Sequence, residues 1–227
     1  MYNPSSVPPV EIKVASSGPI DIIDHGQQVI LYNNGDRWMV FNKENNKEIH
    51  EMYSSYDLAY GDVLVSGLGF GILALWLCNK PEVSTVTVVE ISEDVIKLFK
   101  DANVVPEKLK IINDNMVTYN TDIEYDVLLL DHYERQLHDW ILKDMARICG
   151  RIKHKKFWSW ALEFLYLSQM YNEEDIEIVI DKNGNDLSNY WSEFVDKFLP
   201  QEIMLKNITN DKINEYIYSF FIKENPL

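Results

Sequence analysis

The sequence predicts an α/β fold in which a mostly parallel sheet carries helices on both faces. Three observations lead to this prediction. The run Val63–Val65 is apolar and β-branched, as in a strand buried on both faces. Three glycines at alternate positions of 67–71 follow it, and an apolar helix-like run, Ile72–Cys78, comes next. A second strand-like run, Val83–Val89, ends on Glu90 about 20 residues after the third glycine, a spacing typical of βαβ units.

Seven strand-like runs are expected in the sheet. Between them, helices are predicted over Ser92–Lys100, with Ser92 as N-cap, and over Gln136–Cys149. The basic run Arg151–Lys156 is expected to be a solvated loop. The last two strands are expected to form an antiparallel pair at an edge. The seven runs are Val63–Val65, Val83–Val89, Leu109–Ile112, Tyr125–Asp131, Lys156–Leu162, Ile203–Lys206 and Tyr216–Ile222.

The chain before this sheet is expected to form a separate small element. An extended arm to Gly18 precedes strand-like runs, and the turn Asn33–Asp36 joins Gln28–Tyr32 to Trp38–Phe41 as a β-hairpin. A helix is predicted over Lys47–Ala59. The expected division is residues 1–56 for the arm and small β element, and 57–227 for the α/β domain.

Composition excludes several classes of protein. The 227 residues have a formal net charge of −15 and are 46% hydrophobic, so the chain has enough apolar residues for one core and repels phosphate backbones and anionic membranes. Cys78 and Cys149 form no C-x-x-C motif or Cys/His cluster, which argues against disulfides and a zinc site. No membrane-spanning run or secretory leader is recognisable. We therefore expect a cytoplasmic protein with a small-molecule substrate, no nucleic acid, no membrane and no metal.

Polar residues end four of the predicted strands at one edge of the sheet. The glycine turn at 67–71 follows the first strand, Glu90 ends the second, Asp114 follows the third and Asp131 ends the fourth. Ligands of open α/β sheets bind in the crevice outside the carboxyl ends of the strands. The sequence therefore predicts a ligand crevice lined by these four groups.

The motifs Val-Leu-Val-Ser-Gly-Leu-Gly-Phe-Gly, Val-Thr-Val-Val-Glu-Ile-Ser and Asp-Val-Leu-Leu-Leu-Asp resemble those of class I S-adenosylmethionine-dependent methyltransferases, whose fold is Rossmann-like. This resemblance runs from Asp57 to the carboxyl terminus. The hairpin at Gln28–Phe41 adds a likeness to the spermidine synthase-like branch. In addition, Ile49–Tyr53 is similar to the Tyr-His-Glu-Met stretch that precedes the glycine turn in aminopropyltransferases.

The resemblance implies a cofactor, S-adenosylmethionine or its decarboxylated form, and a set of residues that hold it. The glycine backbone would lie against the methionine moiety, Glu90 would hold the ribose, and Asp114 with Asn115 would lie at the adenine. Asp131 would attract a cationic amine or take its proton beside the reacting centre. The implied cofactor-binding residues are Gly67, Gly69, Gly71, Glu90, Ile91, Asp114, Asn115 and Asp131.

Further candidates surround the implied catalytic acid. His132 and Tyr133 follow Asp131 and are candidates to line the substrate pocket or to act as a base, against the alternative of a solvent-exposed loop. Together with Asp131 they form the predicted catalytic group. The predicted substrate-binding residues are Gln28, His50, Tyr53 and Glu134.

The sequence also departs from both families. Ordinary methyltransferases carry an acid near the first glycine, where this chain has Ser66. Aminopropyltransferases show two acids and a proline in the loop after the fourth strand. Here Asp131–Gln136 has no proline, and Glu134 would have to stand in for the second acid.

The favoured interpretation is a transferase that moves a methyl group from S-adenosylmethionine to a small, amine-bearing or neutral molecule. An aminopropyltransferase that uses decarboxylated S-adenosylmethionine is the alternative. A non-catalytic nucleoside-binding protein of the same fold also stays open, as does a homodimer. An NAD-dependent oxidoreductase is not excluded, although the dinucleotide motif G-x-G-x-x-G is absent.

Overall fold

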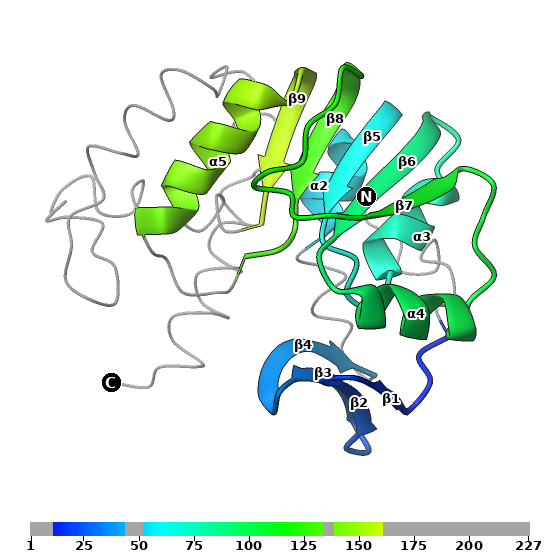
Figure 1. The fold of residues 1–227 in the computed structure, drawn as a ribbon. Helices are drawn as coiled ribbons and strands as arrows, with labels where there is room; N and C mark the ends of the chain where they lie inside the picture. Colours follow the sequence, from blue (N-terminus) through cyan, green and yellow to red (C-terminus); the bar gives the residue numbers. More distant parts are fainter. Residues whose placement is uncertain (1–10, 44–51, 134–138, 161–227) are drawn as a thin grey trace, which may run out of the picture. The chain divides into compact units, whose positions relative to one another are not determined.

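The computed structural model describes residues 11–43, 52–133 and 139–160. All of these except 139–146 belong to one compact unit. The described strands form two sheets, a parallel sheet of five strands and an antiparallel sheet of four (Figure 1). The fold is therefore Rossmann-like α/β with an additional amino-terminal β-sheet.

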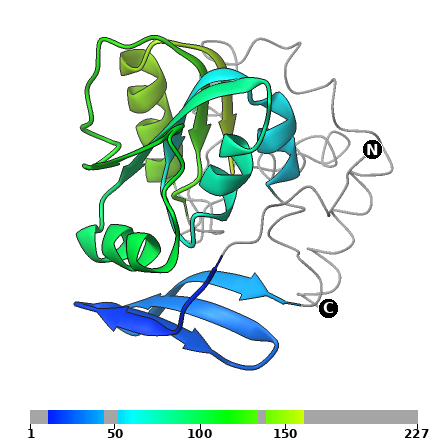
Figure 2. The same cartoon turned by 90° about the vertical axis from the view of Figure 1, so that its right-hand side faces the viewer.

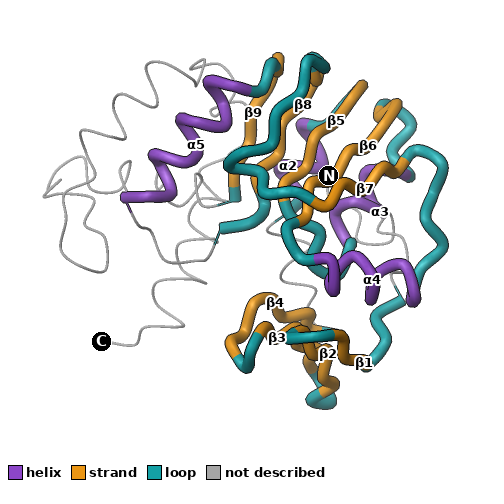
Figure 3. The backbone as a smooth tube through the Cα atoms, viewed as in Figure 1, coloured by secondary structure: helices purple, strands orange, loops and turns teal. Residues whose placement is uncertain are grey.

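The parallel sheet has the strand order β7-β6-β5-β8-β9. Numbered along the chain, this is 3-2-1-4-5, the order of a doubly wound sheet whose direction of winding reverses between its first and fourth strands. Helices follow β5 and β6 along the chain, whereas β7 and β8 are joined by a loop (Figure 3). The strands are β5 (Gly61–Ser66), β6 (Val83–Glu90), β7 (Leu109–Asn113), β8 (Tyr125–Leu130) and β9 (His154–Ser159).

Helices α3 (Ile72–Cys78) and α4 (Glu93–Ala102) pack on one face of this sheet. Val63 and Val65 point toward that face, and every residue of α3 is buried. Helix α4 begins where predicted, because the Ser92 hydroxyl accepts a hydrogen bond from the N–H of Val95 at 3.2 Å. The two helices thus fix the chain on either side of the turn and strand that carry the predicted cofactor residues.

The amino-terminal element is a meander of four strands, which contains the predicted hairpin and, in addition, a short strand at 15–17 within the expected extended arm. The predicted turn is confirmed, with Asn34 and Gly35 at positive φ. Ile20, Ile22 and neighbouring residues of this sheet join the same hydrophobic core as α3 and α4. The strands are β1 (Ala15–Ser17), β2 (Ile20–Asp24), β3 (Gln28–Asn33) and β4 (Asp36–Asn42).

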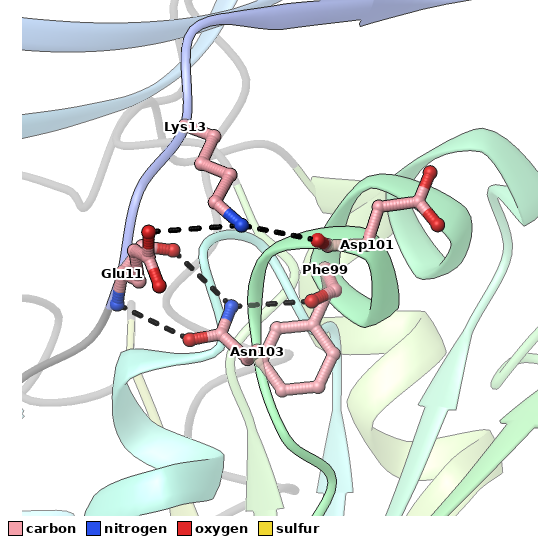
Figure 4. A network of polar contacts seen from close by, with 5 residues as sticks. All are labelled: Glu11, Lys13, Phe99, Asp101 and Asn103. Atoms are coloured by element: carbon pink, nitrogen blue, oxygen red, sulfur yellow. Dashed lines mark hydrogen bonds and ion pairs between the residues drawn. The ribbon is translucent and has the colours of Figure 1, made fainter.

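The side chain of Asn103 holds the amino-terminal segment at the end of α4 (Figure 4). Its amide oxygen accepts from the N–H of Glu11 at 3.1 Å, and its amide nitrogen donates to the carbonyl of Glu11 at 3.2 Å. The same nitrogen donates to the carbonyl of Phe99 at 3.1 Å. Nearby, Lys13 Nζ donates to the carbonyl of Asp101 at 3.3 Å. Both ribbon views show α4 beside the amino-terminal sheet (Figure 2).

Several predictions of elements need correction. The described sheet has five strands, and the two predicted closing strands, 203–206 and 216–222, lie outside the described residues. The basic run is not a loop, because Arg151 ends helix α5 (Asp139–Arg151) and strand β9 begins at His154. Within 52–59, the helix predicted over 47–59 is α2 (Tyr53–Leu58). No helix in the described ranges is long and apolar enough to cross a membrane.

Candidate functional site

The carboxyl ends of β5 and β8 lie side by side at the point where the winding of the sheet reverses. The N–H of Asp131 donates to the carbonyl of Ser66 at 3.0 Å, and the N–H of Gly67 donates to the carbonyl of Val89 at 2.9 Å. A Cβ atom on Gly67 would lie 2.6 Å from the carbonyl oxygen of Asp131. Because φ of Gly67 is also +91°, glycine is required for the strands to end this close together.

The rest of the turn is closely covered by protein. Gly69 has φ +50°, and a Cβ atom there would lie 2.6 Å from Met39 Sδ of β4. The N–H of Phe70 donates to the same sulfur at 3.5 Å. Gly71 has φ +79° and lies against the ring of Phe99 of α4. The amino-terminal sheet therefore forms one wall of the glycine turn.

Glu90 holds the glycine turn from the end of β6. Its Oε2 accepts from the N–H of Leu68 at 2.8 Å, and its Oε1 accepts from the N–H of Ser92 at 2.8 Å. The residue is only 6% exposed. Burial raises the pKa of the Glu90 carboxyl, and the N–H groups around it oppose that effect. Besides Leu68 and Ser92, the backbone N–H groups of Gly69 and Ile91 also act on this carboxylate and lower its pKa.

Glu90 and Asp131 lie in the same row of the sheet. Ser66 of β5 pairs with Val89 on one side and with Leu130 on the other. One residue further along each chain segment, Gly67 therefore lies between Glu90 and Asp131. Two strand spacings separate the two acids, about 10 Å between their backbones. The register thus brings these two predicted residues to one edge, with the first glycine between them.

The end of β7 supplies amide and carboxylate groups to the same edge. The N–H of Asp114 donates to the carbonyl of Glu90 at 3.1 Å, and Asp114 Oδ1 accepts from the N–H of Asn115 at 2.7 Å. Asp114 and Asn115 are both exposed. Ile91 is 62% exposed directly after Glu90, which leaves an apolar side chain available to a flat ring. These predicted adenine-side residues are therefore accessible to a ligand.

His132 turns back from the edge to contact Ser66. The Nδ1 atom of His132 is hydrogen-bonded to the Ser66 hydroxyl, and the His132 ring lies 4.0 Å from the ring of Tyr133, centroid to centroid. Desolvation by the protein around it lowers the pKa of His132 to about 4. Part of His132 remains exposed to solvent, which moderates this effect, but the ring is neutral at pH 7 in either case. Asp131 is half-buried and Tyr133 is buried.

The predicted substrate residues are not joined to this edge by any described contact. Gln28 begins β3, where its carbonyl accepts from the N–H of His25 at 2.8 Å. Tyr53 is the first residue of α2, and only its backbone is described. His50 and Glu134 lie outside the described residues. The substrate-binding assignments of these four residues therefore stay predictions.

Three side-chain roles at the site were not predicted from the sequence, although Asn113 was expected at this edge as part of a polar run. The Asn113 amide donates to the carbonyls of Glu90 and Ile91, both at 3.0 Å, and so fixes the end of β6. Met39 covers Gly69, and the Ser66 hydroxyl engages His132. The polar run 113–115 was a usable signal for Asn113, whereas no local pattern links residues 39 and 69. Among the described residues, no group of His, Cys, Asp and Glu side chains is arranged to bind a metal ion.

Comparisons with known proteins give distant similarities to solved structures. The sequence matches no protein-family model, and no curated protein matches it by sequence. Among solved structures, spermidine synthase from Thermotoga maritima is 17% identical with a TM-score of 0.44, over 59% of this chain and 50% of that one. The methyltransferase domain of bacterial CtHen1-CN is 14% identical with a TM-score of 0.43, over 67% of this chain and 82% of that one.

An S-adenosylmethionine-dependent methyltransferase from Clostridium acetobutylicum is also similar, at 15% identity and a TM-score of 0.35 over 49% of this chain. The match spans 46% of the length of that chain. These similarities concern the arrangement of strands and helices. The strand order and the positive-φ glycine turn of this chain are those of a Rossmann-like sheet, the fold of class I methyltransferases that the sequence motifs resemble.

Proposed function

We propose that this chain is an S-adenosylmethionine-dependent transferase that methylates a small, amine-bearing or neutral molecule. The observation that carries the proposal is the row Glu90–Gly67–Asp131 at the reversal point of the sheet. In this row, Glu90 offers a carboxylate to ribose hydroxyls and Asp131 offers an acid to the substrate. Gly67 between them has no Cβ atom, which leaves the backbone open to a close approach. Ligands bind open α/β sheets at this point.

The residues present fit a nucleoside cofactor. Glu90 places a carboxylate at the carboxyl end of β6, the position from which an acid of this type of sheet accepts hydrogen bonds from a ribose. Ile91 offers an exposed apolar surface for the base, and the second carboxylate oxygen of Asp114 has no partner among the described residues. When bound, S-adenosylmethionine supplies a methyl group on a positively charged sulfur that any nucleophile in line with it can take.

Side chains of this protein would attract the substrate, accept its proton and position it. Asp131 Oδ atoms would attract a cationic amine and hold its proton as it is released, which a carboxylate beside the reacting centre can do. Positioning of two reactants supplies most of the barrier reduction in such transfers. The net charge of −15 favours cationic and neutral substrates over anionic ones.

The aminopropyl alternative differs at the amino-acid end of the cofactor. Decarboxylated S-adenosylmethionine lacks a carboxylate there, so an acidic partner would favour it and a neutral or basic partner would disfavour it. The last residue of β5 is Ser66, with neutral His132 beside it. This neutral pair supports the cofactor that retains its carboxylate.

Calorimetric titration of the full chain with four ligands tests the proposal. We expect S-adenosylmethionine and S-adenosylhomocysteine to bind with similar affinity, and decarboxylated S-adenosylmethionine to bind at least tenfold more weakly, a difference of about 1.4 kcal/mol. Preference for the decarboxylated form would establish the aminopropyl alternative. Binding of NAD alone would overturn the proposal.

A further inference from the structure

The Ser66–His132 contact is a feature that neither sequence motif nor proposed chemistry explains. Ser66 is the last residue of β5 and is 1% exposed. Its backbone carbonyl accepts from the N–H of Asp131, while its hydroxyl is hydrogen-bonded to His132 Nδ1. The serine side chain therefore reaches across the reversal point of the sheet to the residue after the proposed catalytic acid.

The hydroxyl has a definite direction in this hydrogen bond. Among the described residues, His132 is the one hydrogen-bond partner of the Ser66 hydroxyl. If His132 Nδ1–H were the donor, the buried serine O–H would have no acceptor, which costs free energy. If Ser66 donates, its O–H is satisfied and Nδ1 is the acceptor. In a neutral imidazole the other nitrogen, Nε2, must then carry the proton.

We infer that Ser66 is a positioning residue whose hydroxyl donates to Nδ1 of His132, so that His132 presents Nε2–H as a neutral hydrogen-bond donor to the ligand. The Nε2 atom has no hydrogen-bond partner among the described residues, and part of His132 is exposed to solvent. A low pKa keeps the ring neutral, and a neutral histidine that donates is a known way to polarise a ligand oxygen.

This assignment deepens the proposed function, on which it rests for the identity of the ligand. It makes His132 a donor to an oxygen of the cofactor or substrate, such as a carboxylate or hydroxyl. It also removes His132 as the base, because Nε2 already carries a proton. Proton removal from the substrate is then left to Asp131, from the same loop.

The chain contains a matched control for the serine. Ser159 ends β9, is fully buried, and lies in the same sheet row as Ser66, since both are aligned with Leu130. Its hydroxyl has no hydrogen-bond partner among the residues that the structure describes. Ser159→Ala removes a buried hydroxyl from the same row without touching His132, whereas Ser66→Ala removes the proposed donor.

Nitrogen-15 NMR of the labelled full chain without nucleoside tests the inference, with His132→Gln identifying the signals by their disappearance. We expect Nε2 protonated and Nδ1 unprotonated in about tenfold excess over the other tautomer. Ser66→Ala should reduce this ratio to that of an unconstrained histidine, while Ser159→Ala and Ser66→Thr, which keeps a hydroxyl, should preserve it. A dominant Nδ1–H form, or an unchanged ratio in Ser66→Ala, would overturn the inference. Because no nucleoside is added, failure here leaves cofactor binding to be judged separately.

Discussion

The carboxylate of Glu90 accepts a hydrogen bond from the backbone N–H of Leu68 at 2.8 Å, so the end of β6 directly supports the glycine turn after β5. Glu90→Gln retains the size of the side chain but replaces one acceptor oxygen by a donor. The N–H of Leu68 or of Ser92 then loses its acceptor. We expect the free energy of unfolding to fall by about 1–3 kcal/mol, measured by urea denaturation. Glu107→Gln, at an exposed loop position, is the control and should be neutral.

Glycine at position 67 should be needed for steric reasons beyond its backbone angle. An alanine there combines a positive φ with a Cβ atom 2.6 Å from the Asp131 carbonyl oxygen, so we expect a loss of about 2–5 kcal/mol. Gly26 has φ +83° and no atom within 4 Å of its added Cβ. Gly26→Ala should therefore cost only about 1–2 kcal/mol. Equal losses in the two variants would show that the close approach of β5 and β8 is wrong.

The low pKa of His132 makes a prediction about pH. In the unfolded chain the imidazole of His132 has its ordinary pKa of 6.5, whereas in the folded protein its pKa is about 4. The unfolded state therefore binds more protons between these values, so the free energy of unfolding rises with pH in this range and falls as the pH is lowered. Relative to His132→Gln, the wild type should gain stability from pH 4 to 6.5 and none above. Exposure keeps the gain below about 1.4 kcal/mol per pH unit.

His154 also has a lowered pKa, caused by desolvation, and contributes to the pH dependence of the wild type. It is present in both proteins, so the difference between wild type and His132→Gln isolates His132. A difference that is flat with pH contradicts the packing of His132 against Ser66 and Tyr133.

Asn103 should hold the amino-terminal segment against α4. Asn103→Ala removes the two hydrogen bonds to the backbone of Glu11, each worth about 0.5–1.5 kcal/mol. We expect faster amide exchange at Glu11 and along β1, with β5 unchanged. Asn103→Asp keeps the acceptor and loses the donor, so its effect should be at least as large because its charge then faces two carbonyls. Uniform exchange rates along the chain would contradict this role.

Asp131→Asn should separate binding from turnover. The amide retains the size of the side chain but cannot hold the substrate proton, so we expect transfer from methyl-labelled S-adenosylmethionine to a panel of small amines to fall at least a hundredfold. Binding of S-adenosylhomocysteine should stay within about threefold of wild type. Full transfer by the variant would exclude Asp131 as the group that accepts the substrate proton.

Much of the α/β fold was predictable because its signals are local. The apolar runs of β5, β6, β7 and β8, the glycine turn and the Ser92 cap are each specified by a few adjacent residues. Strand β9 begins two residues earlier than predicted and ends at Ser159, because the polar residues His154 and Lys155 hid its start. The exposed Lys155 is accommodated in the strand by an ion pair, since its Nζ lies 2.7 Å from Asp126 Oδ1.

Contacts between distant segments were not predictable. Met39 meets Gly69 through packing of two sheets, and Lys80, a charged residue, is buried because its Nζ donates to the carbonyls of Tyr56 and Asp57 at 2.6 and 2.9 Å. The spacing of apolar residues indicates which face of a helix or strand is buried, but it does not indicate which other element packs against that face. Glu90 and Asp131 were found because each ends a strand, whereas the role of Ser66 depends on a side chain 66 positions away.

Titration of wild type, Glu90→Gln and Glu107→Gln with S-adenosylhomocysteine tests the central claim, that the carboxyl edge of β5, β6 and β8 binds an adenosine cofactor. We expect saturable one-to-one binding to wild type and Glu107→Gln, and at least tenfold weaker binding to Glu90→Gln, as loss of a charged acceptor of about 1.5–3 kcal/mol requires. Absence of binding to wild type, or equal affinity in all three proteins, would contradict the account.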